Sequence, residues 1–406
     1  MPILSSRSLE IQESPIRKLA PYADQAKKEN VRVYHLNIGQ PDLGPPPIVY
    51  DYLNKYDDKC IAYSHSKGEQ EYLDALVKYY HDLGHTDLSS NNFIATLGGS
   101  EAILWSIMTV ADPGDEILTF EPFYTNYHSY CTMADIKLVP IETKIETGFH
   151  LPSKEEIIKK ISNKTKAILI CNPNNPTGTI YNHKELTMVY DICKENNILL
   201  LSDEVYREFS YDGHEVISAL TIEKELEPNT DDSRVIILDS FSKRFSLCGA
   251  RIGFACSRNQ KIMDVMLRYG QSRLAASSII QQMTTEAINK NIDYIKKVVD
   301  KFSEQRQALI NGLKKIDGVI FQEPEGAFYI IAKLPVDDAE KFSKWLLTDY
   351  NDKNETIMLA PANGFYLTEG LGKDEVRIAY VLKKDDLVRA MEILNLAISK
   401  WKTINH

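Results

Sequence analysis

A lysine flanked by serines follows one of the most apolar runs of the chain. Residues 234–239 have the pattern of a buried strand, and Ser240, Ser242 and Lys243 come directly after it. Arg251 lies eight positions beyond the lysine. A lysine at such a place can extend to the surface, since its ammonium is costly to bury. It can also form a Schiff base with an aldehyde, while hydroxyls and a guanidinium bind a phosphate dianion. The grouping therefore indicates a site for pyridoxal phosphate.

Three other segments that follow apolar runs carry groups suited to the same ligand. Residues 97–100 form a glycine turn before a helical pattern, and the N–H groups of such a turn can bind phosphate. Asp203 could pair with a protonated pyridine nitrogen, or could simply cap a helix. Tyr206 could donate a hydrogen bond to a phenolate oxygen. Residues 172–178 contain two prolines and a glycine, which favour a rigid turn that presents an amide side chain.

The elements that must position these residues follow an alternating pattern. Short β-branched runs alternate with patterns of helical spacing between residues 91 and 256. This favours an α/β fold with a mostly parallel central sheet flanked by helices. Such sheets bind ligands at the carboxyl ends of their strands. We expect Ser100 to be the N-cap of the helix that follows the glycine turn.

The pattern changes after residue 292. A long charged helix is predicted over roughly 294–316, and sparser strands and a final amphipathic helix follow it. This favours a second, smaller α+β domain. We therefore expect an N-terminal segment over 1–47 that packs with the small domain and the cleft, a large cofactor-binding domain over 48–292, and a small domain over 293–406.

The composition excludes several classes of function. The chain has 406 residues, of which 26% are charged, and a net charge of −10, so it has no general attraction to nucleic acid or anionic membranes. No apolar run is long enough for a transmembrane helix, and the first residues lack the apolar core of a signal peptide. Six widely separated cysteines are typical of reduced core thiols. We expect a cytoplasmic protein with no metal site.

Taken together, the motifs resemble those of a known family. The glycine turn, the 172–178 turn, the segments that contain Asp203 and Lys243, and the strand-like residues 376–380 occur in the order found in class I/II aminotransferases. These are fold-type-I pyridoxal phosphate enzymes related to bacterial aspartate aminotransferase. The resemblance spans roughly residues 36–380 and implies a homodimer with shared active sites.

The resemblance also implies a role for individual residues. Lys243 would form the Schiff base and act as the general base, and Asp203 would pair with the pyridinium. Tyr206 and Asn175 would bond the 3′-oxygen of the cofactor. The phosphate would be held by Gly99, Ser100, Ser240, Ser242 and Arg251.

Four further residues match positions at the rim of the family's site. Tyr124 would stack on the pyridine ring, and Tyr63 would reach the phosphate of the neighbouring subunit. Arg377 would bind the substrate α-carboxylate with a bidentate fork. Gly39 would lie against the substrate.

The substrate is a harder question. Some bacterial relatives read an acidic side chain with a lysine after the glycine pair, where this chain has Ser100. Others use an arginine of the neighbouring subunit, which makes Arg268 and Arg273 candidates, and Arg17 could also reach the cleft. We expect L-aspartate as the donor and 2-oxoglutarate as the acceptor. An aromatic or other non-acidic substrate, or a lyase or synthase reaction on the same fold, remains the alternative.

Overall fold

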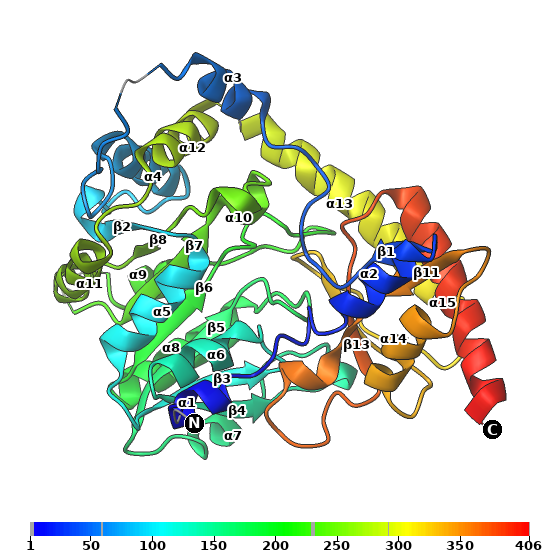
Figure 1. Ribbon diagram of the computed structural model, residues 1–406. Helices are drawn as coiled ribbons and strands as arrows, with labels where there is room; N and C mark the ends of the chain where they lie inside the picture. The colour runs from blue at the N-terminus through cyan, green and yellow to red at the C-terminus, as the bar shows by residue number, and fades with distance from the viewer. Residues whose placement is uncertain (1–3, 58–59, 229–231, 291, 406) are drawn as a thin grey trace.

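The computed structural model describes residues 4–57, 60–228, 232–290 and 292–405. A large sheet and the helices around it form one part of the molecule, and a smaller sheet lies beside it (Figure 1). The long helix α13 (Ile292–Leu313) connects the helices of the large part with the small sheet.

The large sheet has seven strands, and their order places chain-distant segments side by side. Only β8 runs against its two neighbours, so the expected mostly parallel sheet is confirmed, with one reversed strand. In spatial order the strands are β2 (Phe93–Thr96), β8 (Gly253–Cys256), β7 (Val235–Ser240), β6 (Leu199–Asp203), β5 (Thr165–Cys171), β3 (Glu116–Glu121) and β4 (Lys137–Glu142).

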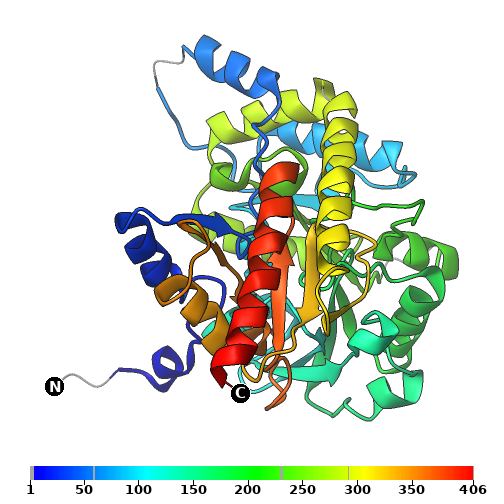
Figure 2. The same cartoon turned by 90° about the vertical axis from the view of Figure 1, so that its right-hand side faces the viewer.

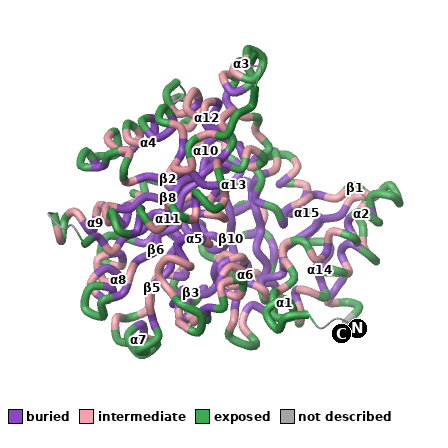
Figure 3. The backbone as a smooth tube through the Cα atoms, turned by 60° about the vertical axis from the view of Figure 1, so that its left-hand side comes forward, coloured by how far each residue is buried: buried purple, intermediate pink, exposed green. Residues whose placement is uncertain are grey.

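Apolar side chains on both faces of these strands explain why helices cover both sides. In β5, Ala167 and Leu169 belong to one core cluster, whereas Ile168 and Ile170 belong to another. Successive residues of a strand point to opposite faces, so a strand that is apolar throughout is buried on both. Figure 3 shows the resulting continuous buried centre.

Helices on both faces of the large sheet contribute side chains to these two core clusters. On the first face lie α5 (Gly99–Val110), α6 (Asn126–Met133) and α11 (Gln260–Arg273). On the second lie α4 (Gln70–Asp82), α8 (His183–Glu195) and α9 (Ala219–Leu226). The remaining helices of this part are α3 (Pro47–Lys55), α7 (Lys154–Ile158), α10 (Phe241–Arg244) and α12 (Ser278–Lys290).

The expected N-cap of α5 is wrong by two residues. Gly98 is the N-cap, with φ +82° and ψ 176°, and Ser100 lies inside the first turn. A glycine is favoured there because a positive φ strains residues that have a Cβ. The first N–H groups of the helix are therefore not capped by the serine side chain.

The small part is built on a four-stranded antiparallel sheet. Its spatial order is β12 (Ala360–Pro361), β13 (Glu375–Ala379), β10 (Tyr329–Lys333) and β9 (Ile320–Phe321). Helices α14 (Ala339–Thr348) and α15 (Lys384–Asn405) complete it, and α15 lies alongside α13 (Figure 2). The helix predicted over 294–316 is α13, which begins two residues and ends three residues earlier than expected.

The N-terminal segment packs with this small part. Its strand β1 (Arg32–His35) pairs in parallel with β11 (Glu355–Met358), and α2 (Ala20–Lys28) contacts α14. The short helix α1 (Ser6–Glu10) instead contacts α6 of the large part. Short 3-10 helices occur at Ser90–Asn92, Ile145–Thr147, Cys248–Ala250 and Ala362–Phe365.

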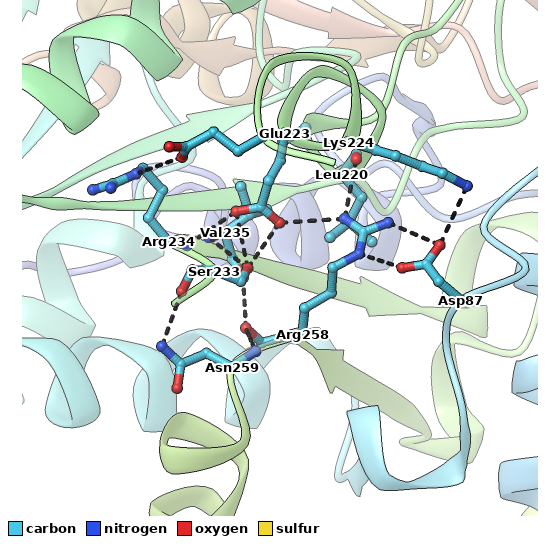
Figure 4. Close-up of polar contacts among 12 residues, drawn as sticks. Asp87, Leu220, Glu223, Lys224, Ser233, Arg234, Val235, Arg258 and Asn259 are labelled. Carbon is cyan, nitrogen blue, oxygen red and sulfur yellow. Dashed lines mark hydrogen bonds and ion pairs between the residues drawn. The ribbon is translucent and has the colours of Figure 1, made fainter. Parts of the chain in front are cut away.

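A polar network secures the start of β7, the strand that leads to Lys243 (Figure 4). Glu223 of α9 is fully buried and accepts hydrogen bonds from the Ser233 hydroxyl and from the Arg234 backbone N–H. Arg258 donates to Glu223 at 3.2 Å and to Asp87 at 2.6 Å. Because the buried carboxylate is fully bonded, the network can hold the strand in place without an unpaired charge.

No helix in the described parts of the chain combines the length and the apolar character needed to span a bilayer.

Candidate active site

The carboxyl ends of five strands bring the predicted residues together. Gly98 follows β2, Tyr124 follows β3, Asn175 follows β5, Asp203 ends β6, and Lys243 follows β7. These strands run in the same direction, so their ends meet at one edge of the sheet. This is the edge at which α/β sheets bind ligands.

Lys243 lies on the four-residue helix α10 and is half-buried. Its Nζ donates to the backbone oxygen of Gly39 at 2.8 Å and lies 5.7 Å from the centre of the Phe328 ring. The helix itself is anchored by a buried ion pair, in which Arg244 donates to both carboxylate oxygens of Asp239 at 2.6 Å. The lysine therefore projects from a firmly held turn toward the N-terminal segment.

Asp203 is buried without a cation to balance it. Its Oδ2 accepts a hydrogen bond from the Tyr127 hydroxyl at 2.6 Å, and its Oδ1 accepts one from the Val205 N–H at 3.3 Å. Burial raises the pKa of this carboxyl to about 7. Within the described residues, no Lys, Arg or His forms an ion pair with it, so a protonated nitrogen of a ligand would supply the missing charge.

Arg377 carries the opposite charge to Asp203 and is likewise buried without a counter-ion. It is 1% exposed; its Nη1 donates to Asn175 Oδ1 at 3.0 Å and its Nη2 to the Asn37 backbone oxygen at 2.6 Å. Desolvation lowers its pKa below the ordinary value. No carboxylate in the described chain pairs with it, and its Nε is without a hydrogen-bond partner. Such a guanidinium is suited to bind a carboxylate ligand.

Asn175 joins this guanidinium to Tyr206. The Asn175 amide donates to the Tyr206 hydroxyl at 3.4 Å, while its oxygen accepts from Arg377. The structure thus brings three of the predicted residues into direct contact, although they are far apart in the sequence.

The glycine turn and Arg251 form a cradle for an anion. The Arg251 guanidinium donates to the backbone oxygens of Leu97 and Cys248 at 3.2 and 3.0 Å. A Cβ on Gly98 would lie 2.7 Å from Arg251 Nη2, so the close approach requires a glycine. Arg251 itself has φ +54°, a left-handed conformation that costs energy for a residue with a Cβ.

The two serines beside the lysine contact each other. The Ser240 and Ser242 hydroxyl oxygens are 2.8 Å apart, and Ser240 Oγ donates to the Ile252 backbone oxygen. Gly99 and Ser100, in the first turn of α5, are partly exposed. A Cβ built on Gly99 lies 3.7 Å from that of Ser240, so the turn and the serines are neighbours.

Tyr124 and Gly39 line the same region. The Tyr124 hydroxyl accepts a hydrogen bond from Asn126 at 2.9 Å.

Tyr63 differs from the other predicted site residues, because its side chain is 83% exposed and stands away from its own chain. Its placement leaves it free to contact another subunit.

The candidate side-chain readers differ in their surroundings. Arg273 donates to Glu101 at 2.7 Å and to the Ser66 backbone oxygen at 3.1 Å, and it packs over the Trp105 ring. These contacts give Arg273 a structural role within its own chain. Arg268 and Arg17 are exposed.

Three contact residues were missed in the sequence. Tyr127, Tyr329 and Asn37 touch Asp203, Tyr206 and Arg377, respectively. Tyrosines within strand or helix patterns look like ordinary core residues, so only the hydrogen bonds of their hydroxyls reveal them. Asn37 contributes a backbone oxygen, which leaves no signal in the residue type.

These residues fit pyridoxal phosphate on several counts. An unbalanced carboxylate suits a pyridinium, the glycine turn with Arg251 suits a phosphate, and Lys243 suits an aldehyde. Fold and site together define a fold-type-I pyridoxal phosphate enzyme.

A family model places the chain more closely. The model for aminotransferase class I and II matches residues 31–394, and the chain belongs to this family. The resemblance seen in the motifs is confirmed, together with the cofactor, which is pyridoxal phosphate, and the fold.

Relatives and solved structures agree over nearly the full length. An aspartate aminotransferase from Pyrococcus horikoshii is 29% identical over 98% of both chains. The crystal structure of an aspartate aminotransferase from Thermotoga maritima has a TM-score of 0.88 and 28% identity, over 98% of this chain and 100% of the other. An alanine aminotransferase from Pyrococcus furiosus also has a TM-score of 0.88, at 27% identity, with the same coverage.

Proposed function

We propose that this aminotransferase transfers the amino group of L-aspartate to 2-oxoglutarate by a ping-pong reaction. The observation that carries the amino-acid part is the buried, uncompensated guanidinium of Arg377 beside Asn175 and Tyr206. It would bind the α-carboxylate that every amino acid and oxo acid substrate carries. When bound, pyridoxal phosphate supplies an electron sink for the bond that breaks at the α-carbon.

The chain's own residues then have distinct tasks. Asp203 holds a proton on the pyridine nitrogen, because its carboxylate gains a charge partner there. Arg377 orients the substrate by its carboxylate, so that the α-hydrogen points toward Lys243. Lys243 would take that proton from the α-carbon as a general base and would return it to the C4′ carbon of the cofactor, on the other side of the substrate nitrogen.

The choice of aspartate rests on the relatives. The contacts of the two candidate arginines bear on which of them would bind the side-chain carboxylate of aspartate. Arg273 is occupied by Glu101, so Arg268 is the better candidate for the side-chain carboxylate, supplied from a neighbouring subunit. The solved alanine aminotransferase is as similar in fold, which favours a small non-acidic amino acid as the second candidate.

The proposal includes a homodimer. Tyr63 and Ile61 are 83% and 70% exposed on the same segment, and large exposed apolar side chains commonly mark an interface. A neighbour's Tyr63 would complete the phosphate site. A cytoplasmic location stays part of the proposal and rests on the cysteine pattern.

The decisive test adds L-aspartate alone to the cofactor-loaded protein and records the absorption spectrum. We expect the visible band to be replaced by that of pyridoxamine phosphate, with oxaloacetate released in equal amount. Lys243→Ala should abolish this change, because the base is lost. A band that L-alanine converts and L-aspartate leaves unchanged would overturn the aspartate assignment while keeping the aminotransferase.

A further inference from the structure

Four side chains of the site form a closed ring of contacts. Arg377 donates to Asn175 at 3.0 Å, and Asn175 donates to the Tyr206 hydroxyl at 3.4 Å. The Tyr206 and Tyr329 hydroxyl oxygens are 3.0 Å apart, and the Tyr329 ring lies 4.4 Å from the Arg377 guanidinium carbon. Tyr329 and Arg377 come from adjacent strands of the small sheet, whereas the other two follow strands of the large sheet.

Tyr329 is held tightly at the centre of the site. A Cβ on Gly39 would lie 1.8 Å from its hydroxyl oxygen, so the phenol occupies the space directly above this glycine. The backbone oxygen of the same glycine accepts the hydrogen bond of Lys243. The ring also packs edge-on to Tyr206, with centroids 5.6 Å apart. Tyr329 therefore has little freedom to leave the ring of contacts.

The hydrogen bonds available to the Tyr206 hydroxyl indicate the role of the Tyr329 hydroxyl. A phenol has one proton to donate and two lone pairs to accept with. Asn175 fills one lone pair of the Tyr206 hydroxyl, because its amide nitrogen can only donate. If Tyr329 donates to the other, the proton of Tyr206 is left for a third partner. Two incoming hydrogen bonds also polarise the hydroxyl and make it a stronger donor.

We propose that Tyr329 is a positioning residue that directs the Tyr206 proton to the cofactor's 3′-oxygen and backs the carboxylate-binding face of Arg377. The inference rests on the proposed assignment of Tyr206 to that oxygen, and it holds whichever amino acid is the substrate. Arg377, which would bind the substrate, and Tyr206, which would bond the cofactor, are thus connected through Asn175 and Tyr329.

Tyr329→Phe tests the hydroxyl, since it retains the ring over Arg377. The visible absorption of the cofactor-loaded protein is titrated with pH. The 3′-oxygen carries more negative charge in the high-pH form, so a weaker donor stabilises that form less. We expect the pH midpoint to rise by about half a unit or more, as befits one weakened hydrogen bond.

Tyr329→Leu tests the ring, using maleate as a dicarboxylate that cannot react. Relative to Tyr329→Phe, we expect about a threefold or greater loss of maleate affinity, because the guanidinium loses the nearer of its two aromatic rings and keeps only Phe365, at 5.0 Å. Tyr211→Phe is the matched control, since it removes a buried hydroxyl that donates to the Ala327 backbone oxygen at 2.6 Å, outside the ring. Its midpoint and maleate affinity should equal those of the wild type.

Tyr206→Phe separates the two levels of the argument. If it raises the midpoint and Tyr329→Phe does not, the inference is overturned and the proposed function stands. If neither variant moves the midpoint although both bind the cofactor, the assignment of Tyr206 fails, and the inference fails with it.

Discussion

At the scale of single residues, two opposite charges are buried without counter-ions. Asp203 lacks a cation and Arg377 lacks an anion within the described chain, and burial shifts the pKa of each toward its neutral form. Uncompensated buried charge destabilises a protein unless a ligand balances it. We therefore expect these residues to make the protein less stable without its ligands than with them. Their charges indicate a cationic group bound at Asp203 and an anionic group bound at Arg377.

Asp203→Asn should change how the stability of the cofactor-free protein depends on pH. The pKa of Asp203 is raised to about 7, so the folded state binds its proton more tightly than the unfolded state does. Its contribution to stability is full below about pH 4 and is lost as pH rises to about 7. The variant should escape this loss, which is on the order of a few kcal/mol.

Urea unfolding at pH 4.5 and 7.5 measures the effect. The free energy of unfolding of the wild type should fall relative to that of Asp203→Asn over this interval. Equal changes in both proteins would contradict the raised pKa. With pyridoxal phosphate bound, the wild type should be the more stable of the two at pH 7.5, because the pyridinium then balances the carboxylate.

At the scale of elements, the start of α5 decides how an anion is held. The helix begins after Gly98 rather than at a serine cap, and the Arg251 guanidinium donates to the backbone oxygen of Leu97 in the turn and to that of Cys248 in its own loop. The N–H groups of the first turn and the positive end of the helix are left to face a ligand. An α5 capped by Ser100 would have satisfied one of those donors internally.

Gly98→Ala should lower both stability and cofactor affinity. The alanine would have to keep the positive φ of Gly98, and its Cβ would lie 2.7 Å from Arg251 Nη2, so the guanidinium would have to shift. Gly114→Ala is the matched control, because it has φ +87° and open space around it. The control should lose about 1 kcal/mol from backbone strain alone.

Thermal unfolding and titration with pyridoxal phosphate separate the two effects. Gly98→Ala should lose more stability than Gly114→Ala and should bind the cofactor at least tenfold more weakly, since one charged hydrogen-bond donor is misplaced. A Gly98→Ala protein with wild-type cofactor affinity would show that Arg251 has no part in the phosphate site.

At the scale of the whole molecule, the site lies where the large and small sheets meet. Phe123 N–H donates to the Phe365 backbone oxygen, and Glu121 accepts from the backbone N–H groups of Leu367 and Thr368. These contacts join the two parts beside the site. Tyr63 is 83% exposed, and the family resemblance assigns it to the phosphate site of a neighbouring subunit, which is why we expect the functional unit to be larger than one chain.

Mixed dimers test this expectation. Chains with Lys243→Ala and chains with Tyr63→Ala should each have little activity at low cofactor concentration. If the sites are shared, a mixed dimer contains one site with both residues intact, so mixing should raise activity above the sum of the two. Sedimentation should show a dimer throughout. Activities that merely add after subunit exchange would place Tyr63 outside the neighbour's site.

Much of the fold could be predicted from the sequence because its signals are local. All seven strands of the large sheet coincide with apolar β-branched runs, and β8 alone runs in the unexpected direction. Strand direction depends on the connection and the neighbour rather than on residue type, so the pattern could not show it. The N-cap of α5 was misplaced since serine and glycine can both cap a helix, and only the backbone conformation distinguishes them.

The family, the cofactor and the motifs at the strand ends could be predicted from the residues alone, because turns and strands encode these within a few positions. Which side chains touch became clear only from the folded chain. The fold joins Arg377, Asn175, Tyr206 and Tyr329 in one ring, and it pairs Arg273 with Glu101. Most of these contacts link residues more than a hundred positions apart, so their distances depend on how strands and helices pack in the folded chain.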